Sequence, residues 1–292
     1  MANAAARRLT KSRIFLLTSL AMVAFASNSL LCRLALKQTG IDPATFTSLR
    51  IFSGAVALWL ITKVRRISSN KSGNWPSAFA LFVYAAAFSF AYVTLSAGTG
   101  ALLLFGAVQV TMIMWGFHTG ERLDVIQILG LIVALAGLVV LVFPVLSSPP
   151  LIGSTLMLSA GVAWGIYSVR GKAAGDAIAV TAGNFVRAAL FAAAISVALI
   201  ARAHVDVAGI RYAIISGAIT SGLGYVIWYN ALSGLKATSA ATVQLSVPVL
   251  AAGGGILLLG EPITLRYLLA SVAVLGGIAL VIWERAHAKQ DL

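Results

Sequence analysis

The chain has 292 residues, of which 60% are hydrophobic and 10% are charged, and its mean hydropathy is +0.97. A soluble domain cannot bury that much apolar surface, so the composition excludes a water-soluble protein. The formal net charge of +13 suggests a nucleic-acid partner at first sight, but the basic residues lie at the ends of long apolar segments, as in membrane proteins.

Apolar segments of about 20 residues predict membrane-spanning helices. Ten such segments follow one another along the chain, at 14–36, 44–63, 76–97, 99–118, 123–144, 150–171, 177–201, 209–231, 236–259 and 263–283. The first imitates a secretory signal, because basic residues precede it and Ala24-Phe25-Ala26 resembles a cleavage site. We expect it to remain uncleaved, since its hydrophobicity continues through Leu36 and cleavage would break the repeat described below.

Lysine and arginine are distributed unequally between the two ends of these segments. Fourteen lie on the side of the N-terminus and five on the other, with Arg50 and Arg187 inside helices. Because cytoplasmic loops carry such an excess, the sequence predicts an inner-membrane protein with both termini in the cytoplasm. Topology and anionic lipid then explain the positive charge, and no nucleic-acid partner is expected.

An internal repeat organises the chain. Gly260-Glu261 repeats Gly120-Glu121 at an offset of 140 residues, and each pair precedes an apolar helix with a glycine-rich end. An odd number of helices in each unit places the second unit upside down in the membrane. The sequence therefore predicts an all-α polytopic membrane protein with ten transmembrane helices in two inverted-topology five-helix repeats, residues 1–146 and 147–292.

Acidic residues are absent from the middle of every predicted span. The eight of them occupy loops, helix ends or the tail: Asp42, Glu121, Asp124, Asp176, Asp206, Glu261, Glu284 and Asp291. A charge at the bilayer centre costs about 3 kcal/mol and is retained only for function. Antiport through a buried carboxylate is therefore disfavoured, and facilitated transport or exchange is favoured. The sequence also shows no metal-ligand cluster, nucleophile–base pair or phosphate loop, so we expect neither an enzyme nor a cofactor.

Arg50 and Arg187 are the charges closest to the membrane interior. Each could bind a substrate carboxylate, or it could tie neighbouring helix ends together through backbone carbonyls. Because both halves carry one at the same place, the sequence favours a structural role for both.

Aromatic and amide side chains in the middle of helices predict a central binding site. Tyr84, Phe88 and Tyr92 recur every four residues and form one stripe. Aromatic faces and hydroxyls suit a partly apolar, zwitterionic solute whose ammonium rests on a ring. Packing or an interfacial belt is the alternative for the rings, and helix–helix adhesion is the alternative for the glutamines. The other candidate substrate-binding residues are Asn28, Gln109, Trp164, Tyr167, Tyr225, Trp228, Tyr229 and Gln244.

Three further features have expected structural roles. Pro248 lies in the ninth segment, where it predicts either a gating hinge or a static kink. Glu121 and Glu261 precede the fifth and tenth helices and are expected to cap them. Aromatic residues near helix ends are expected to form an interfacial belt: Trp59, Trp75, Tyr267 and Trp283.

Several local motifs resemble the drug/metabolite transporter superfamily, in particular its EamA-type exporters with ten helices in two repeats. They are Ala237-Thr238-Ser239-Ala240-Ala241, Pro248, Gly260-Glu261-Pro262 and the arginine in the second helix of each repeat. Gln109 at the place of Pro248 and Phe25 at the place of an expected Trp depart from the pattern. The resemblance covers residues 14–284 and implies export of metabolites, with amino acids the commonest cargo.

We therefore predict a transporter that exports hydrophobic or aromatic amino acids by alternating access. Its expected partners are the lipid bilayer and a small-molecule substrate, and a homodimer stabilised by the fifth and tenth helices is left open. Two alternatives remain from the sequence. The cargo could be a drug-like or nucleotide-derived metabolite, or the chain could be a non-transporting membrane scaffold or sensor.

Overall fold

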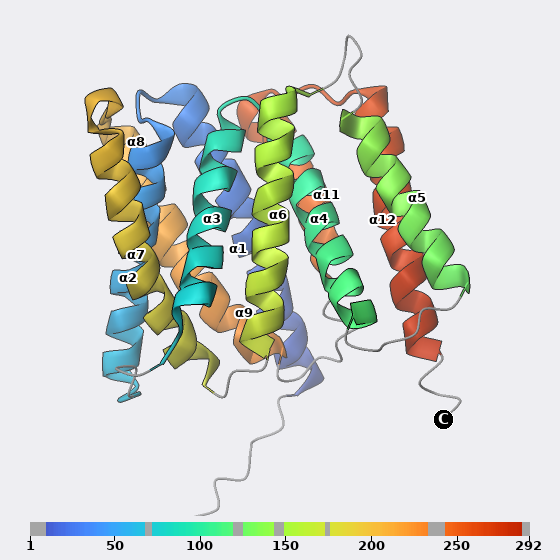
Figure 1. Cartoon of the computed structure of the whole chain (residues 1–292), viewed down its shortest axis with the longest axis horizontal. Helices are drawn as coiled ribbons and strands as arrows, with labels where there is room; N and C mark the ends of the chain where they lie inside the picture. Colours follow the sequence, from blue (N-terminus) through green and yellow to red (C-terminus); the bar gives the residue numbers. More distant parts are fainter. Residues whose placement is uncertain are drawn as a thin grey trace, which may run out of the picture.

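The computed structural model describes residues 10–67, 72–118, 125–142, 149–172, 176–232 and 243–287, which are helical and contain no strand (Figure 1). The expected motifs at Gly120-Glu121 and Ala237–Ala241, and the side chain of Trp283, lie outside what is described. The elements are α1 (Lys11–Gln38), α2 (Pro43–Val64), α3 (Trp75–Tyr92), α4 (Ala97–His118), α5 (Val125–Val142), α6 (Leu151–Lys172), α7 (Ala177–Ala198), η1 (Ile200–Arg202), α8 (Val207–Ile215), η2 (Ser216–Leu223), α9 (Gly224–Leu232), α11 (Ser246–Leu259) and α12 (Leu265–His287).

Within the described residues these elements make ten crossings of the bundle, because α8, η2 and α9 follow one another without a break. Seven crossings are long and apolar enough to span a membrane, and α5, α11 and α12 add three shorter apolar helices. The fold is that of a polytopic all-α membrane protein, as predicted. One predicted span was too long, since α3 ends at Tyr92 and residues 93–96 connect it to α4.

The two halves of the chain run in opposite directions. In Figure 1, α1 begins at the lower end of the bundle, where α12 ends, whereas α6 begins at the upper end. We call these the terminal end and the far end. At the far end, the α1–α2 connection pairs with the α7–α8 connection, where the Asp42 amide donates to the His204 carbonyl (3.2 Å). These connections follow the first helix of one half and the second helix of the other, as inverted topology requires.

Short polar side chains begin several of the helices. Asp176 caps α7 and Asp206 caps α8, each by accepting hydrogen bonds from backbone amides of the first turn. Asp42 caps α2 in the same way and also accepts from the His204 amide (2.9 Å). Although partial burial acts to raise it, hydrogen bonds from Thr45 and His204 hold the pKa of the Asp42 carboxyl below its usual value.

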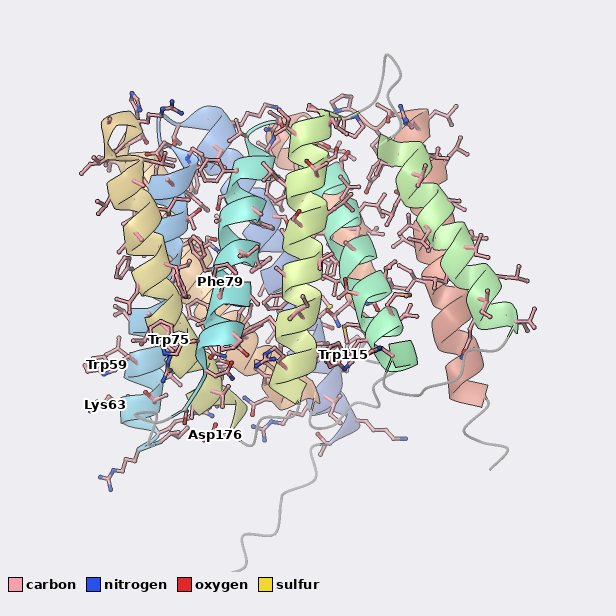
Figure 2. All side chains as sticks on the ribbon, viewed as in Figure 1. Trp59, Lys63, Trp75, Phe79, Trp115 and Asp176 are labelled. Atoms are coloured by element: carbon pink, nitrogen blue, oxygen red, sulfur yellow. The ribbon has the colours of Figure 1, made fainter. Side chains whose placement is uncertain are left out.

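Aromatic residues at the terminal end face outward. Trp59 and Trp75 are 51% and 53% exposed, and Figure 2 shows both in the lower part of the bundle, with Trp115 also labelled there. The Lys63 ammonium lies 5.8 Å from the centre of the Trp59 ring. Exposed tryptophans beside a lysine at one level of the bundle are typical of a membrane–water interface. Tyr267, in contrast, lines a pocket at the far end.

Candidate functional site: a closed central cavity

A small cavity lies in the middle of the bundle, enclosed by α1, α3, α4, α6, η2 and α9. Its volume is about 10 Å³, close to the room that one water molecule needs. The cavity is therefore too small for a metabolite, which could enter only if the surrounding helices moved apart. Its lining residues are Phe25, Asn28, Ser29, Tyr84, Phe88, Leu104, Phe105, Trp164, Thr220 and Tyr225.

Aromatic rings from four crossings meet around this cavity. The Trp164 ring lies 4.8 Å from that of Tyr84 and 4.9 Å from that of Tyr225, measured between ring centroids. Phe25 presents an edge to Trp164, to Tyr225 and to Trp228 at 5.8–6.4 Å. Such tilted and edge-on pairs are favoured by the ring quadrupoles and hold the rings in place. The structure thus brings rings of α3, α6 and α9 that the sequence assigned to one site together with Phe25 of α1.

A polar network borders the rings on one side. The Tyr84 hydroxyl accepts hydrogen bonds from Asn28 Nδ2 (3.3 Å) and Arg50 Nη2 (2.9 Å). Asn28 Oδ1 in turn accepts from Ser216 Oγ (2.6 Å) and Thr220 Oγ1 (3.3 Å). Arg50 Nε donates to the hydroxyl of Ser221 (3.3 Å), which is the sixth member of the network.

Three of these hydroxyls come from η2, an eight-residue π-helical segment that the sequence analysis missed. Its sequence, Ser-Gly-Ala-Ile-Thr-Ser-Gly-Leu, has small side chains that let it approach α2 closely. A Cβ atom on Gly217 would collide with the Arg50 carbonyl oxygen, so only glycine fits there. The wider π turn places Ser216, Thr220 and Ser221 on the face toward α1 and α2. Such turns are frequent at functional sites. A cluster of glycine and hydroxyl residues inside an apolar segment was the available signal.

The other predicted site residues do not line this cavity. Tyr92 is fully buried one turn farther along α3, with its ring 4.7 Å from Phe88 and its hydroxyl donating to the Ala97 carbonyl (3.3 Å). Tyr167 and Trp228 form a second layer behind Trp164 and Phe25. The four remaining predicted residues are also absent from the lining: Gln109, Tyr229, Gln244 and Pro248. Residues that the sequence analysis did not assign to the site are Ser29, Leu104, Phe105, Thr220 and the network member Arg50.

Pro248 is the third residue of α11, preceded by a turn at Leu245. Val243 and Gln244 are also helical, and Leu245 between them and α11 has a right-handed helical backbone (φ −65°, ψ −15°). Helix therefore lies on both sides of the turn that precedes Pro248, as expected where a proline removes an amide hydrogen from the ladder.

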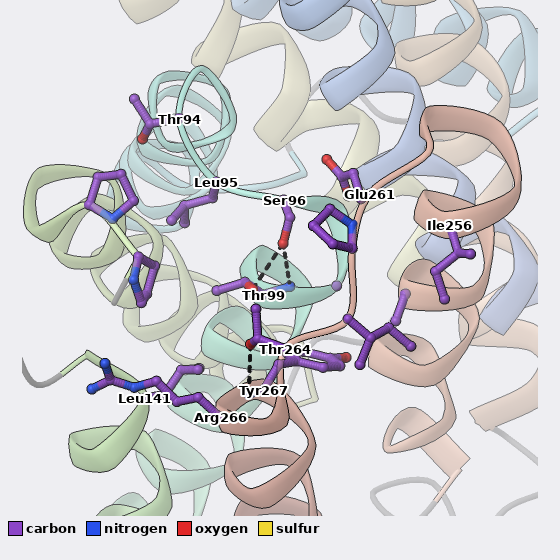
Figure 3. Close-up of a pocket in the computed structure, with 16 residues that line it drawn as sticks. Thr94, Leu95, Ser96, Thr99, Leu141, Ile256, Glu261, Thr264, Arg266 and Tyr267 are labelled. Atoms are coloured by element: carbon purple, nitrogen blue, oxygen red, sulfur yellow. Dashed lines mark hydrogen bonds between the residues drawn. The ribbon is translucent and has the colours of Figure 1, made fainter. Parts of the chain in front are cut away.

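A larger pocket of about 220 Å³ lies at the far end, between the α3–α4 and α11–α12 connections. Figure 3 shows Ser96 and Thr99 on one side of it and Glu261, Thr264 and Tyr267 on the other. This pocket is not the site predicted from the sequence, and it lacks the convergence of rings and hydroxyls found in the centre. The central cavity is therefore the candidate site.

Glu261 ties the connections around the far-end pocket together. Its Oε1 accepts from Arg33 Nε (2.9 Å) and its Oε2 accepts from the Ala97 amide at the start of α4 (2.7 Å). Arg33 Nη1 also donates to the carbonyls of Tyr92 (2.8 Å) and Val93 (3.0 Å) at the end of α3. The expected cap on the following helix, α12, was therefore wrong for Glu261. Its carboxylate stabilises the N-terminus of α4, in the other half of the chain.

A model of the EamA-like transporter family matches residues 12–143 and again residues 151–283. The chain belongs to the EamA-like transporter family. The two matches cover nearly all of the chain, and they place one copy of the family unit before the start of α6 and one copy from α6 onward.

Proteins similar to this EamA-like transporter occur in bacteria and archaea. An uncharacterized protein of Pseudomonas aeruginosa is 57% identical over 94% of this chain and 96% of its own length. The uncharacterized transporter YoaV of Bacillus subtilis is 24% identical over 82% of this chain and 86% of its own length. An uncharacterized transporter of Archaeoglobus fulgidus is 27% identical, over 84% and 90% respectively. A solved crystal structure aligns with a TM-score of 0.65, covering 93% of this chain and 98% of that one, at 18% identity, which supports the fold alone.

The two arginines that this EamA-like transporter carries inside its helices have different surroundings. Arg187 is half-buried and donates from Nη1 to the carbonyls of Ser72 (2.8 Å) and Gly183 (2.9 Å). This is the structural role that the sequence favoured. Arg50 is 2% exposed and donates to the side chains of Tyr84 and Ser221, which border or line the cavity. The two arginines therefore have different partners, side-chain hydroxyls for Arg50 and backbone carbonyls for Arg187.

Proposed function

We propose that this EamA-like transporter exports hydrophobic or aromatic amino acids from the cytoplasm across the inner membrane, working by alternating access at the central cavity. Both termini then face the cytoplasm, and the terminal end of the bundle is the cytoplasmic end. The observation that carries the proposal is the convergence of aromatic rings and hydroxyls from both halves of the chain on one buried place. Sites between two inverted repeats, near the middle of the membrane, are typical of secondary transporters.

The chemistry of the cavity supports an amphipathic cargo. The faces of Trp164, Tyr84 and Tyr225 provide an apolar surface on which a side chain or an ammonium group can rest. The neighbouring network supplies hydroxyl and amide groups for hydrogen bonds. No acidic side chain lines the cavity within the described part of the chain. We therefore propose facilitated transport or exchange, with no carboxylate that carries a proton.

Flux measurements with a matched pair of tryptophan variants test this proposal. Proteoliposomes containing the full chain are preloaded with radiolabelled phenylalanine or leucine, and efflux is followed with and without an imposed proton gradient. Trp164→Leu removes a ring at the centre of the cavity, whereas Trp59→Leu removes an exposed ring at the terminal end. We expect Trp164→Leu to lower the efflux rate about tenfold or more and Trp59→Leu to leave it nearly unchanged, because only the first loses contact with cargo.

The proton gradient supplies the second criterion. Equal flux with and without it agrees with the proposal, whereas flux that requires the gradient contradicts the proposed energetics. An absence of flux for every amino acid favours a drug-like or nucleotide-derived cargo, or a scaffold. Equal losses in the two tryptophan variants would remove the central cavity as the route.

A further inference from the structure

We propose that Arg50 anchors a carboxylate in the central cavity, so that an anionic group on the cargo is what the site recognises. This inference rests on the proposed function for its cargo, and it goes further by naming one chemical group and the residue that binds it. The starting observation is a positive charge that the protein buries without a negative partner. Among the described residues, the one ion pair joins Arg33 and Glu261 at the far end.

The surroundings of Arg50 offset its charge only in part. Its carbon Cζ lies 4.8 Å from the centre of the Phe88 ring and 5.1 Å from that of Tyr84, which are favourable cation–π distances. Nε and Nη2 donate to neutral hydroxyls, but Nη1 is buried without any hydrogen-bond partner. A buried charge in a membrane protein is costly and is typically retained for function. A guanidinium nitrogen that remains free is the group that most favours a carboxylate oxygen.

Two more unpaired polar groups lie on the wall of the cavity. The hydroxyls of Ser29 and Tyr225 are buried without hydrogen-bond partners in the described structure, and both residues line the cavity. Buried polar groups are normally satisfied, so several orphans at one place require an explanation. A carboxylate explains them together, because its oxygens accept several hydrogen bonds from hydroxyl and guanidinium donors at once.

The arrangement also separates the two ends of a cargo molecule. Arg50 lies behind Tyr84 and Phe88, two residues of the cavity wall that contact its guanidinium directly. The rings of Trp164 and Phe25 contact those of Tyr84 and Tyr225, at 4.8 Å and 6.1 Å between centroids. A carboxylate at the guanidinium would therefore leave the rest of the molecule among the rings. Arg187 of the second half provides an internal contrast. Its Nη1 donates to two backbone carbonyls, so this nitrogen already has partners within the protein.

A set of three compounds that share a phenylethyl unit tests the inference. Sodium 3-phenylpropionate carries the carboxylate alone, phenethylamine hydrochloride carries the amine alone, and phenylalanine carries both. The melting temperature of the purified full chain is measured with each compound and with sodium chloride at the same ionic strength, because a ligand that binds the folded state raises it. We expect 3-phenylpropionate and phenylalanine to raise the melting temperature of the wild type, and phenethylamine and chloride not to do so.

Arginine variants then locate the effect. Arg50→Gln should abolish the rise caused by both carboxylates, and Arg187→Gln should retain it. Arg50→Lys should keep only part of it, since an ammonium lacks the planar fork that a carboxylate prefers. If Arg50→Gln does not fold, Phe88→Leu takes its place. It keeps the guanidinium but removes the ring that holds it, and it should weaken apparent carboxylate affinity several-fold.

The outcomes separate this inference from the proposed function. A carboxylate-dependent rise that requires Arg50, in a protein without amino-acid flux, supports the anchor and overturns the amino-acid cargo. Amino-acid flux without any carboxylate effect on the wild type overturns the anchor alone. A rise of equal size with phenethylamine, or an undiminished rise in the Arg50→Gln or Phe88→Leu protein, also overturns the anchor.

Discussion

Tyr84 is the residue on which the ring cluster and the polar network both depend. Its ring contacts Trp164 and Phe88, at 4.8 Å and 5.5 Å between centroids. Its hydroxyl accepts hydrogen bonds from Asn28 on α1 and Arg50 on α2. One side chain on α3 therefore orients groups on two other helices. Because all three residues are buried, water cannot replace the Tyr84 hydroxyl as the acceptor for either donor.

Removal of that hydroxyl should destabilise the protein while the ring cluster stays in place. Tyr84→Phe leaves two buried donors without an acceptor, which should lower the free energy of unfolding by about 1–3 kcal/mol. The measurement is thermal or denaturant-induced unfolding of the purified protein in detergent. Tyr212→Phe on α8, a half-buried tyrosine outside the network, is the control. A loss of the same size in both variants would mean that the network contributes nothing particular to stability.

At this scale the sequence predicted ring positions better than charge partners. The stripe of Tyr84 and Phe88 follows from a spacing of four residues, which fixes one helix face. The difference between Arg50 and Arg187 had no such signal, because the two occupy matching places in matching helices. The difference arises from their hydrogen-bond partners. Arg187 donates to the backbone carbonyls of Ser72 and Gly183, whereas Arg50 donates to the hydroxyls of Tyr84 and Ser221.

Helices were predictable as elements because apolar runs of membrane-spanning length have few alternatives in lipid. The π segment Ser216–Leu223 was not, since its register depends on packing and not on local preference. Gly217 packs directly against the Arg50 carbonyl, so the absence of a side chain at this position is required by a helix more than 150 residues away in the chain. The same dependence on a distant partner made Glu261 a cap for α4 and not for the helix that follows it.

The packing of α5 against α12 offers a test of close helix approach. A Cβ atom on Gly277 would lie 2.5 Å from the Gly130 carbonyl oxygen and 2.7 Å from the Ala134 amide nitrogen. Gly276, its neighbour on α12, has nothing within 4 Å. Gly277→Ala should therefore force the two helices apart and lower the free energy of unfolding by about 1–3 kcal/mol.

The adjacent glycine serves as a matched control. Gly276→Ala meets no atom and removes flexibility from the unfolded chain, so it should be neutral or stabilising by up to about 1 kcal/mol. Thermal unfolding of both purified variants in the same detergent is the measurement. If the two variants unfold at equal temperatures, α5 and α12 are not held at the distance described, and their close approach makes no contribution to stability.

For the whole molecule, a cavity of about 10 Å³ means that the bundle is closed around its site. At the far end, Glu261 connects Arg33 of α1 and the start of α4 to the α11–α12 connection, in addition to the contact between Asp42 and His204. Arg33 extends the connection to the end of α3. Both halves of the chain therefore meet at Glu261. Alternating access requires that one end can separate while the other stays closed, and this ion pair is one contact that separation of the far end would break.

Breaking that contact should expose the interior from the far end, and the chain carries its own reporter. Cys32, its single cysteine, is fully buried beside Arg33. Buried thiols are inert, so its reaction with a maleimide measures opening. Glu261→Ala should raise the labelling rate about tenfold or more, which corresponds to about 1.4 kcal/mol in the opening equilibrium. That is less than the full cost of leaving a buried charge unpaired, because Arg33 keeps its two carbonyl partners.

The side of the membrane from which Cys32 is labelled shows which side the far end faces. If that end faces outward, as proposed, a membrane-impermeant maleimide added outside intact cells should reach Cys32 in the Glu261→Ala protein. Asp206→Asn is the control, because it changes an acidic cap at the same end that forms no ion pair in the described structure. Labelling that rises equally in both variants would indicate general loosening of the bundle. An unchanged rate in Glu261→Ala would show that the ion pair stabilises α4 without closing the far end.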